Sequence, residues 1–149
     1  MRKKCMNVTQ TQPAQRKGQG VAIISKHNWQ QAPLLQELCN DCTTVSLCTN
    51  SNKEGMQRVI VIGHYSKQGE QPEQDEKLCF LIKNLHQGYK NTELFLGGDF
   101  NRSRKEMSVL AKRLNLNLLE QEIEAATRVQ GEQRSEIDFI LTKHRIVET

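Results

Sequence analysis

The side chains best placed to do chemistry stand at the end of the segment FLGGDFN, residues 95–101. Its apolar first half predicts a buried strand, which would deliver Asp99 and Asn101 on the same face, two residues apart. Gly97 and Gly98 would let another backbone or a phosphate approach closely. Because sites in α/β sheets usually form beyond the C-terminal ends of strands, the pattern predicts a site here. The same residues are also good turn formers, so a plain turn after the strand is the alternative.

A second carboxylate, Asp138, stands inside the apolar run at residues 137–141. A charged group in a buried strand is costly unless it is paired. Asp138 is therefore predicted either to belong to a site or to be neutralised by Arg128 or by backbone amides.

The strands that would position these residues follow from short β-prone runs. Such runs predict a buried strand at residues 21–24 and further strands at 93–97 and 137–141. The runs at 43–48 and 58–63 flank a turn cluster at 50–55 and predict a hairpin. The second strand of this hairpin is apolar at consecutive positions, which predicts a central place in the sheet.

Two helices are predicted to cover the sheet. The first follows Pro72 and ends near Gly88, and its apolar residues recur at the spacing of one helix face. The second begins with Ser103 and Glu106, which have the spacing of a capping box. The apolar stripe of the first helix consists of Leu78, Leu81, Ile82 and Leu85. Alternating strands and helices predict an α/β layered domain at residues 20–149, preceded by a polar, basic and irregular arm at residues 1–19.

Four segments resemble the endonuclease/exonuclease/phosphatase family, which includes DNase I-like enzymes, and are close to its retroelement endonucleases. GGDFN at residues 97–101 resembles the family signature. GVAII at 20–24, VIGHYS at 61–66, and TR at 127–128 followed by SEIDFI at 135–140 resemble its GGVAI, VINVYAP and TR…SRIDYI segments. The four occur in the family's order, from about residue 20 to residue 143. The resemblance implies an incomplete, DNase I-like α/β sandwich.

The resemblance also implies roles for individual residues. Asp99 matches the residue that orients or deprotonates the attacking water, and Asn101 matches one that binds the scissile phosphate. Tyr65 and Arg128 fall at positions that resemble phosphate contacts. Asp138 matches the carboxylate that holds a catalytic histidine in its working tautomer. Family members use Mg²⁺ or Mn²⁺, so either ion is expected if this domain is active and no cofactor is expected otherwise.

The sequence departs from the family's pattern at both ends. The family's early Asn strand and metal-binding Glu have no counterpart before residue 20, because Asn7 lies too close and Gln36-Glu37 follows the strand it should precede. The terminal Ser-Asp-His is also missing, since His144 comes too soon after the Asp138 strand. The chain is therefore predicted to be an incomplete copy that is inactive alone, with no residue assigned to a metal.

Composition limits the class of protein. The chain has 149 residues, of which 36% are hydrophobic and 26% charged, and this predicts one globular domain. No apolar run approaches the roughly 20 residues of a membrane span. A net charge of +4 is compatible with a nucleic acid partner. Five cysteines without a secretory signal predict reduced thiols in a reducing compartment, which is cytoplasm, nucleus or organelle matrix. Cys39, Cys42 and Cys48 lack the further ligands that a zinc site would need.

Two functions remain open. The chain is either a metal-dependent nuclease domain, acting on DNA or RNA once a partner supplies the missing elements, or an inactive remnant that serves as a subunit of a larger assembly. Both predict a protein partner that covers the truncated sheet, because isolated proteins avoid exposed sheet edges. His64 is predicted as a surface or satisfied core residue and Trp29 as a core anchor. A basic cluster would either contact phosphates or form a solvated helix face, and it consists of Arg102, Arg104, Lys105, Lys112 and Arg113.

Overall fold

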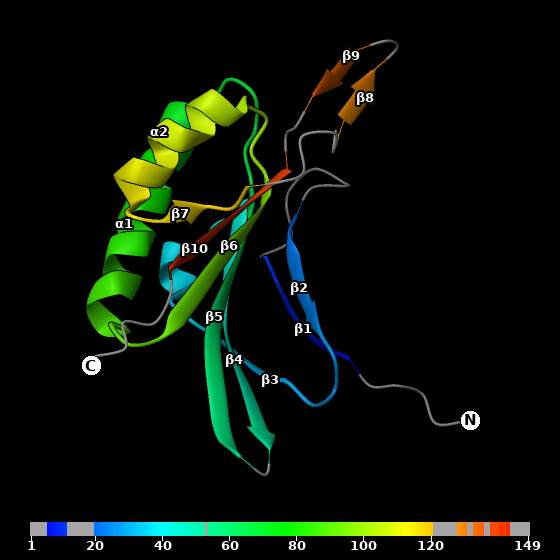
Figure 1. Cartoon of the computed structure of the whole chain (residues 1–149), viewed down its shortest axis with the longest axis vertical. Coiled ribbons are helices and arrows are strands. Elements are labelled where there is room, and N and C mark those ends of the chain that lie inside the picture. Colours follow the sequence, from blue (N-terminus) through cyan, green and yellow to red (C-terminus); the bar gives the residue numbers. More distant parts are fainter. Residues whose placement is uncertain are drawn as a thin grey trace.

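The chain folds around a six-stranded mixed sheet (Figure 1). The computed structural model describes residues 6–11, 20–52, 54–120, 128–130, 133–135 and 138–143, and only the backbone of 128–130 and 133–135. In spatial order the strands of the main sheet are β3 (Gln30–Pro33), β4 (Thr43–Asn52), β5 (Gly55–Tyr65), β6 (Glu93–Asp99), β10 (Asp138–Lys143) and β7 (Asn117–Leu118).

The predicted hairpin and its central second strand are confirmed. β4 and β5 pair antiparallel over their full lengths, and β5 lies between β4 and β6. β5 and β6 run parallel, which requires a crossover between them, and the helix α1 (Gln71–Gly88) provides it. β10 then returns antiparallel to β6. The sheet is therefore an α/β sheet with antiparallel strands on both sides of one parallel pair.

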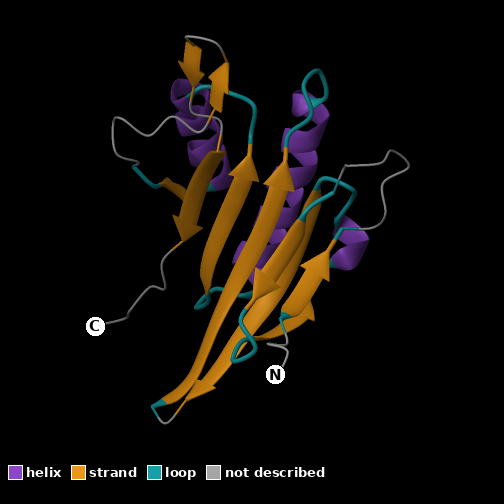
Figure 2. Ribbon diagram, turned by 90° about the vertical axis from the view of Figure 1, so that its right-hand side faces the viewer, coloured by secondary structure: helices purple, strands orange, loops and turns teal. Residues whose placement is uncertain are grey.

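Both predicted helices form, and they lie on one side of the sheet (Figure 2). The expected apolar stripe of α1 is buried. The second helix, α2 (Arg104–Leu114), begins with the predicted capping box, in which the Ser103 hydroxyl accepts a hydrogen bond from the Glu106 backbone N–H and the Glu106 carboxylate accepts one from the Ser103 N–H. A short 3-10 helix, η1 (Gln36–Leu38), connects β3 and β4.

The core lies between the helices and the sheet. Cross-strand register aligns Val45, Ile62, Leu96 and Leu141 in one row across four strands, and all of them are buried. Burying an aliphatic side chain of this size stabilises the fold by roughly 1.5–3 kcal/mol. Neighbouring residues of a strand point to opposite faces, so the burial of this apolar row determines which face of each strand packs against the helices.

A second, smaller layer covers part of the opposite face. β1 (Asn7–Gln10) and β2 (Ala22–Ser25) form a two-stranded antiparallel sheet that packs against β4 and β5. The prediction of an irregular segment is wrong for residues 7–10, because β2 and the main sheet satisfy the polar strand β1: the Thr9 hydroxyl bonds Ser46 and the Asn7 amide donates to the Trp29 carbonyl. The prediction of a buried strand holds for Ile23 and fails for Ile24, which is 62% exposed.

The remaining described strands, β8 (Arg128–Gln130) and β9 (Gln133–Ser135), pair antiparallel with each other. No helix within the described ranges is long and apolar enough to cross a membrane.

Candidate active site

Three of the predicted site residues form one row at the edge of the main sheet. Asp99 is the last residue of β6, and it pairs directly with Asp138, the first residue of β10, and with Tyr65, the last residue of β5. Directly paired residues point to the same face of a sheet. The two carboxylates therefore leave the same edge side by side, and their chemical roles stay predictions.

The row lies on the face opposite the helices. The neighbouring row, His64, Gly98 and Phe139, points toward the helices, and the rings of His64 and Phe139 lie 5.3 Å and 6.4 Å from that of Phe100 in the core. Because side chains alternate along a strand, Tyr65, Asp99 and Asp138 point the other way, to the side that β1 and β2 partly cover.

Asn101 reaches this edge from a turn rather than from the strand. Its backbone is left-handed, with φ of 47°, and its N–H donates to Asp99 Oδ1 at 3.0 Å. The turn that the sequence offered as an alternative is therefore present, and it engages one oxygen of Asp99. The Asn101 amide Nδ2 donates to the Ser66 carbonyl at 2.8 Å. A carboxamide has two N–H donors, so this contact fixes the group while its second donor can serve an anion.

Comparison with known proteins identifies the fold. No family model matches the chain, and no curated protein matches it by sequence. The endonuclease domain of TRAS1, a telomere-specific non-LTR retrotransposon, superposes with a TM-score of 0.64 and 16% identity over 91% of this chain and 66% of that one. The catalytic domain of human Nocturnin gives 0.60 and 18%, over 92% of this chain and 60% of that one. An endonuclease/exonuclease/phosphatase family protein from Leptotrichia buccalis gives 0.51 and 13%, over 94% and 60%.

The chain has the DNase I-like fold of the endonuclease/exonuclease/phosphatase proteins. It spans about 60 to 66% of the length of these structures. The predicted fold class, an α/β sandwich with a sheet core and two covering helices, is confirmed.

Of the other two predicted phosphate contacts, the structure describes the side chain of Tyr65 but not that of Arg128. Tyr65 is half-buried at the end of β5, in the row with Asp99. The side chain of Arg128 lies outside the described residues, so its contact with phosphate or with Asp138 stays a prediction. Asp138 is exposed and makes an interaction of its own, so it is not an unpaired charge.

The described residues contain no preformed cluster of side-chain ligands for Mg²⁺ or Mn²⁺. Within the described ranges no group of three or more His, Cys, Asp or Glu side chains could hold a metal ion. Asp99 and Asp138 offer two carboxylates, and because Mg²⁺ is often held by one or two carboxylates together with waters and phosphate oxygens, further oxygen ligands would have to complete its coordination. Burial raises the pKa of the Cys42 and Cys48 thiols, which disfavours the thiolate that binds zinc.

The buried histidine behind the row was predicted only as a surface or core residue. His64 is buried, with Nδ1 at 2.8 Å from Thr43 Oγ1 and Nε2 at 3.1 Å from Ser66 Oγ. The pKa of His64 is lowered to about 4, chiefly by burial; the negative charge of Asp75 opposes this shift and the positive charge of Arg102 adds to it. His64 is therefore a neutral, satisfied core residue at pH 7.

The basic cluster separates into residues with different surroundings. Arg102 is not a solvated or phosphate-binding side chain: it is 7% exposed and forms two hydrogen bonds to the Asp75 carboxylate. Arg113 pairs with Glu76 on the surface, and Lys105 and Lys112 are exposed. Sequence reasoning missed the roles of Asp75 and Ser66 near Asn101, because their contacts join residues 27 to 36 positions apart.

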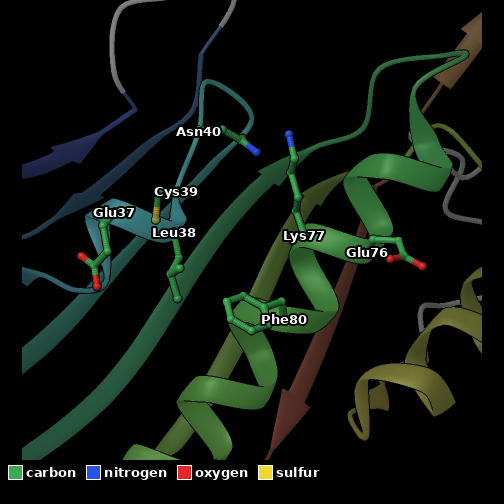
Figure 3. Close-up of a pocket in the computed structure, with 7 residues that line it drawn as sticks. All are labelled: Glu37, Leu38, Cys39, Asn40, Glu76, Lys77 and Phe80. Carbon is green, nitrogen blue, oxygen red and sulfur yellow. The ribbon is translucent and has the colours of Figure 1, made fainter.

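One pocket among the described residues lies away from this site. A hollow of about 560 Å³ lies between η1 and α1, where Leu38 and Phe80 point toward each other (Figure 3). None of the predicted site residues lines it. The candidate active site is therefore the sheet edge that carries Asp99 and Asp138 rather than this hollow.

Proposed function

We propose that this chain is a nuclease-derived domain that takes part in phosphodiester hydrolysis on DNA or RNA when a partner completes its site. The observation that carries the proposal is the row of Tyr65, Asp99 and Asp138, with Asn101 held beside it. Among the similar structures, TRAS1 is by its description an endonuclease domain of a retrotransposon.

The residues present can supply part of a hydrolytic mechanism. Asp99 keeps one carboxylate oxygen beyond its turn contact and would orient or deprotonate the attacking water. Asn101 would donate its second N–H to the phosphate, and Tyr65 would lie beside it. Asp138 would orient a histidine supplied by the partner. The partner would also have to supply the ligands for a divalent cation, whose chemistry when bound is to neutralise charge on the phosphate.

We expect the partner to contribute an extended segment to the smaller layer. Within the described residues β2 is paired with β1 alone, so its second edge offers backbone donors and acceptors. Where that layer covers the sheet, Val21 lies so close to Gly63 that a Cβ added to Gly63 would be 2.5 Å from the Val21 side chain. At Gly97, in the next strand, the nearest described atoms belong to the neighbouring strand β10, and Ile140 there is 46% exposed. A strand with alternating apolar residues would pair with β2 and cover Gly97 and Ile140.

A second candidate function is structural. Asp99 and Asn101 already take part in a turn, and a remnant kept for its fold would retain this turn without catalysis. In that case the chain would be an inactive subunit of a larger assembly, with its uncovered layer buried against a neighbour. A monodisperse, well-folded monomer in solution would contradict this alternative.

The test is a cleavage assay on the complex that co-purifies with the chain. Labelled DNA and RNA oligonucleotides would be incubated with Mg²⁺ or Mn²⁺, with wild-type chain and with Asp99→Ala or Asp138→Asn in the same assembly. Glu54→Gln is the matched control, because Glu54 is an exposed carboxylate beside the opposite end of β5. We expect cleavage by the wild type and the control and its loss in both site variants. Cleavage that survives Asp99→Ala would refute the proposal, and an intact assembly that never cleaves would favour the structural alternative.

A further inference from the structure

Ser66 is the residue through which the end of β5 holds the turn that carries Asn101. It is completely buried, and each of its polar groups makes a contact with a different residue. Its N–H donates to the Asp99 carbonyl at 2.8 Å, and its carbonyl accepts from Asn101 Nδ2 at 2.8 Å. Its hydroxyl lies 3.1 Å from His64 Nε2 and 3.5 Å from Arg102 Nη2. The position of Ser66 therefore sets where the Asn101 carboxamide points.

Arg102 connects the same turn to the first helix. Its Nη1 and Nη2 donate to the two oxygens of Asp75 at 2.9 and 3.0 Å, and its Nε donates to the Phe100 carbonyl at 3.2 Å. The side chains of Arg102 and Asp75 are only 7% and 15% exposed, so solvent screens this pair little. Two parallel bonds between a guanidinium and a carboxylate also fix the geometry of both groups. Gln71, from the same helix, donates to the Asn101 carbonyl at 3.1 Å.

The chemistry of the groups limits the direction of the hydrogen bonds. A guanidinium can only donate, so the Ser66 hydroxyl accepts from Arg102 and has its own proton left to give. The low pKa of His64 leaves its ring neutral, with one N–H. With the Ser66 proton on the hydrogen bond to His64 Nε2, the ring carries its N–H at Nδ1 and donates to Thr43 Oγ1. This is the arrangement that the inference assigns, and in it the four side chains form one chain of donors that runs from Arg102 to Thr43.

We infer that Arg102, locked by Asp75, is a positioning residue that acts through Ser66 to hold the Asn101 carboxamide toward the reacting phosphate. This inference rests on the proposed function for its catalytic consequence, whereas the arrangement of the side chains stands without it. The sequence offered Arg102 either as a phosphate contact or as part of a solvated helix face, and its burial against Asp75 gives it this different role.

The variants that test the inference are Arg102→Gln and Ser66→Ala. Arg113→Gln is the matched control. Arg113, in α2, also pairs with a carboxylate of α1, that of Glu76, but this pair lies on the surface. NMR of the chain labelled with ¹⁵N reports two properties that do not need activity: the tautomer of the His64 ring and the signals of the Asn101 side-chain amide. Steady-state cleavage by the assembly reports kcat and KM.

In the wild type and in Arg113→Gln we expect one His64 tautomer, with the proton on Nδ1, and a single set of Asn101 amide signals. In Arg102→Gln and Ser66→Ala we expect a mixture of tautomers and shifted or broadened Asn101 signals. Where the assembly cleaves, kcat should fall about 10²-fold with little change in KM, since a misplacement of about 1 Å can have that effect. If Arg102→Gln fails to fold, Ser66→Ala answers the question alone, because it removes the hydroxyl and leaves the ion pair.

Unchanged His64 and Asn101 signals in the folded variants would overturn the inference, whatever happens to cleavage. A fall in kcat with unmoved Asn101 signals would also overturn it, because Arg102 would then act by another route. An assembly that never cleaves, combined with the expected NMR changes, would refute the proposed function and retain the positioning of Asn101.

Discussion

The buried His64 should make the stability of this fold depend on pH in a way that one substitution removes. The pKa of His64 is lowered from its ordinary value of 6.5 to about 4 in the folded chain. Between these two values the unfolded chain binds the proton more readily than the folded chain does. The stabilisation is therefore fully present above pH 6.5 and is lost as the pH falls toward 4.

The size of the effect follows from the shift. One pKa unit corresponds to about 1.4 kcal/mol, so a decrease from 6.5 to about 4 costs the folded state about 3 kcal/mol once the pH has reached 4. Asp75 and Arg102 act on His64 in opposite senses, so burial is the cause that dominates. Replacing His64 by Gln removes the titration while a polar side chain can still reach Ser66.

The assay is urea unfolding at several pH values between 7.5 and 4.5, for the wild type and His64→Gln. Carboxylates titrate in both proteins, so the difference between their free energies of unfolding isolates His64. We expect the wild type to lose about 2 kcal/mol more than the variant by the lowest of these pH values. His27→Gln, at an exposed histidine, should follow the wild type. A constant difference across this range, or one of the opposite sign, would refute the assignment of His64 as a buried neutral group.

Three further substitutions test the fold around the site. Gly98→Ala should destabilise the chain by more than about 1 kcal/mol in urea unfolding, because Gly98 has φ of 152° and an added Cβ would overlap the His64 carbonyl. An equal loss of stability for Gly97→Ala, where an added Cβ meets no atom closer than 3.9 Å, would contradict this reason. Ser103→Ala should cost about 1 kcal/mol through loss of the helix cap, and an unchanged melting temperature would argue against the capping box. Leu96→Ala should cost about 2–5 kcal/mol because Leu96 is buried at the centre of the sheet, while Val109→Ala, at an exposed position of α2, should be nearly neutral, and similar losses for both would contradict the placement of the core.

The elements of this fold were largely predictable because their signals are local. The stripe at Leu78, Leu81, Ile82 and Leu85 has the period of a helix, and the Ser103–Glu106 pair satisfies backbone donors within its own turn. The two β-prone runs on either side of the turn cluster at residues 50–55 pair as predicted, although β4 extends into that cluster as far as Asn52. The strand at residues 7–10 gave no such signal, since its polar residues are satisfied by β2 and the main sheet rather than by their neighbours in sequence.

The sequence by itself determined which side chains could do chemistry, and it placed Asp99 and Asn101 after a strand and Asp138 within one. Only the tertiary structure decided that Asp138 lies opposite Asp99, because cross-strand register joins residues 39 positions apart. It also decided that Arg102 is a buried partner of Asp75, which a charged residue in a basic cluster does not reveal. Periodicity reports which face of one element is buried, whereas the contacts that position a site depend on how separate elements pack.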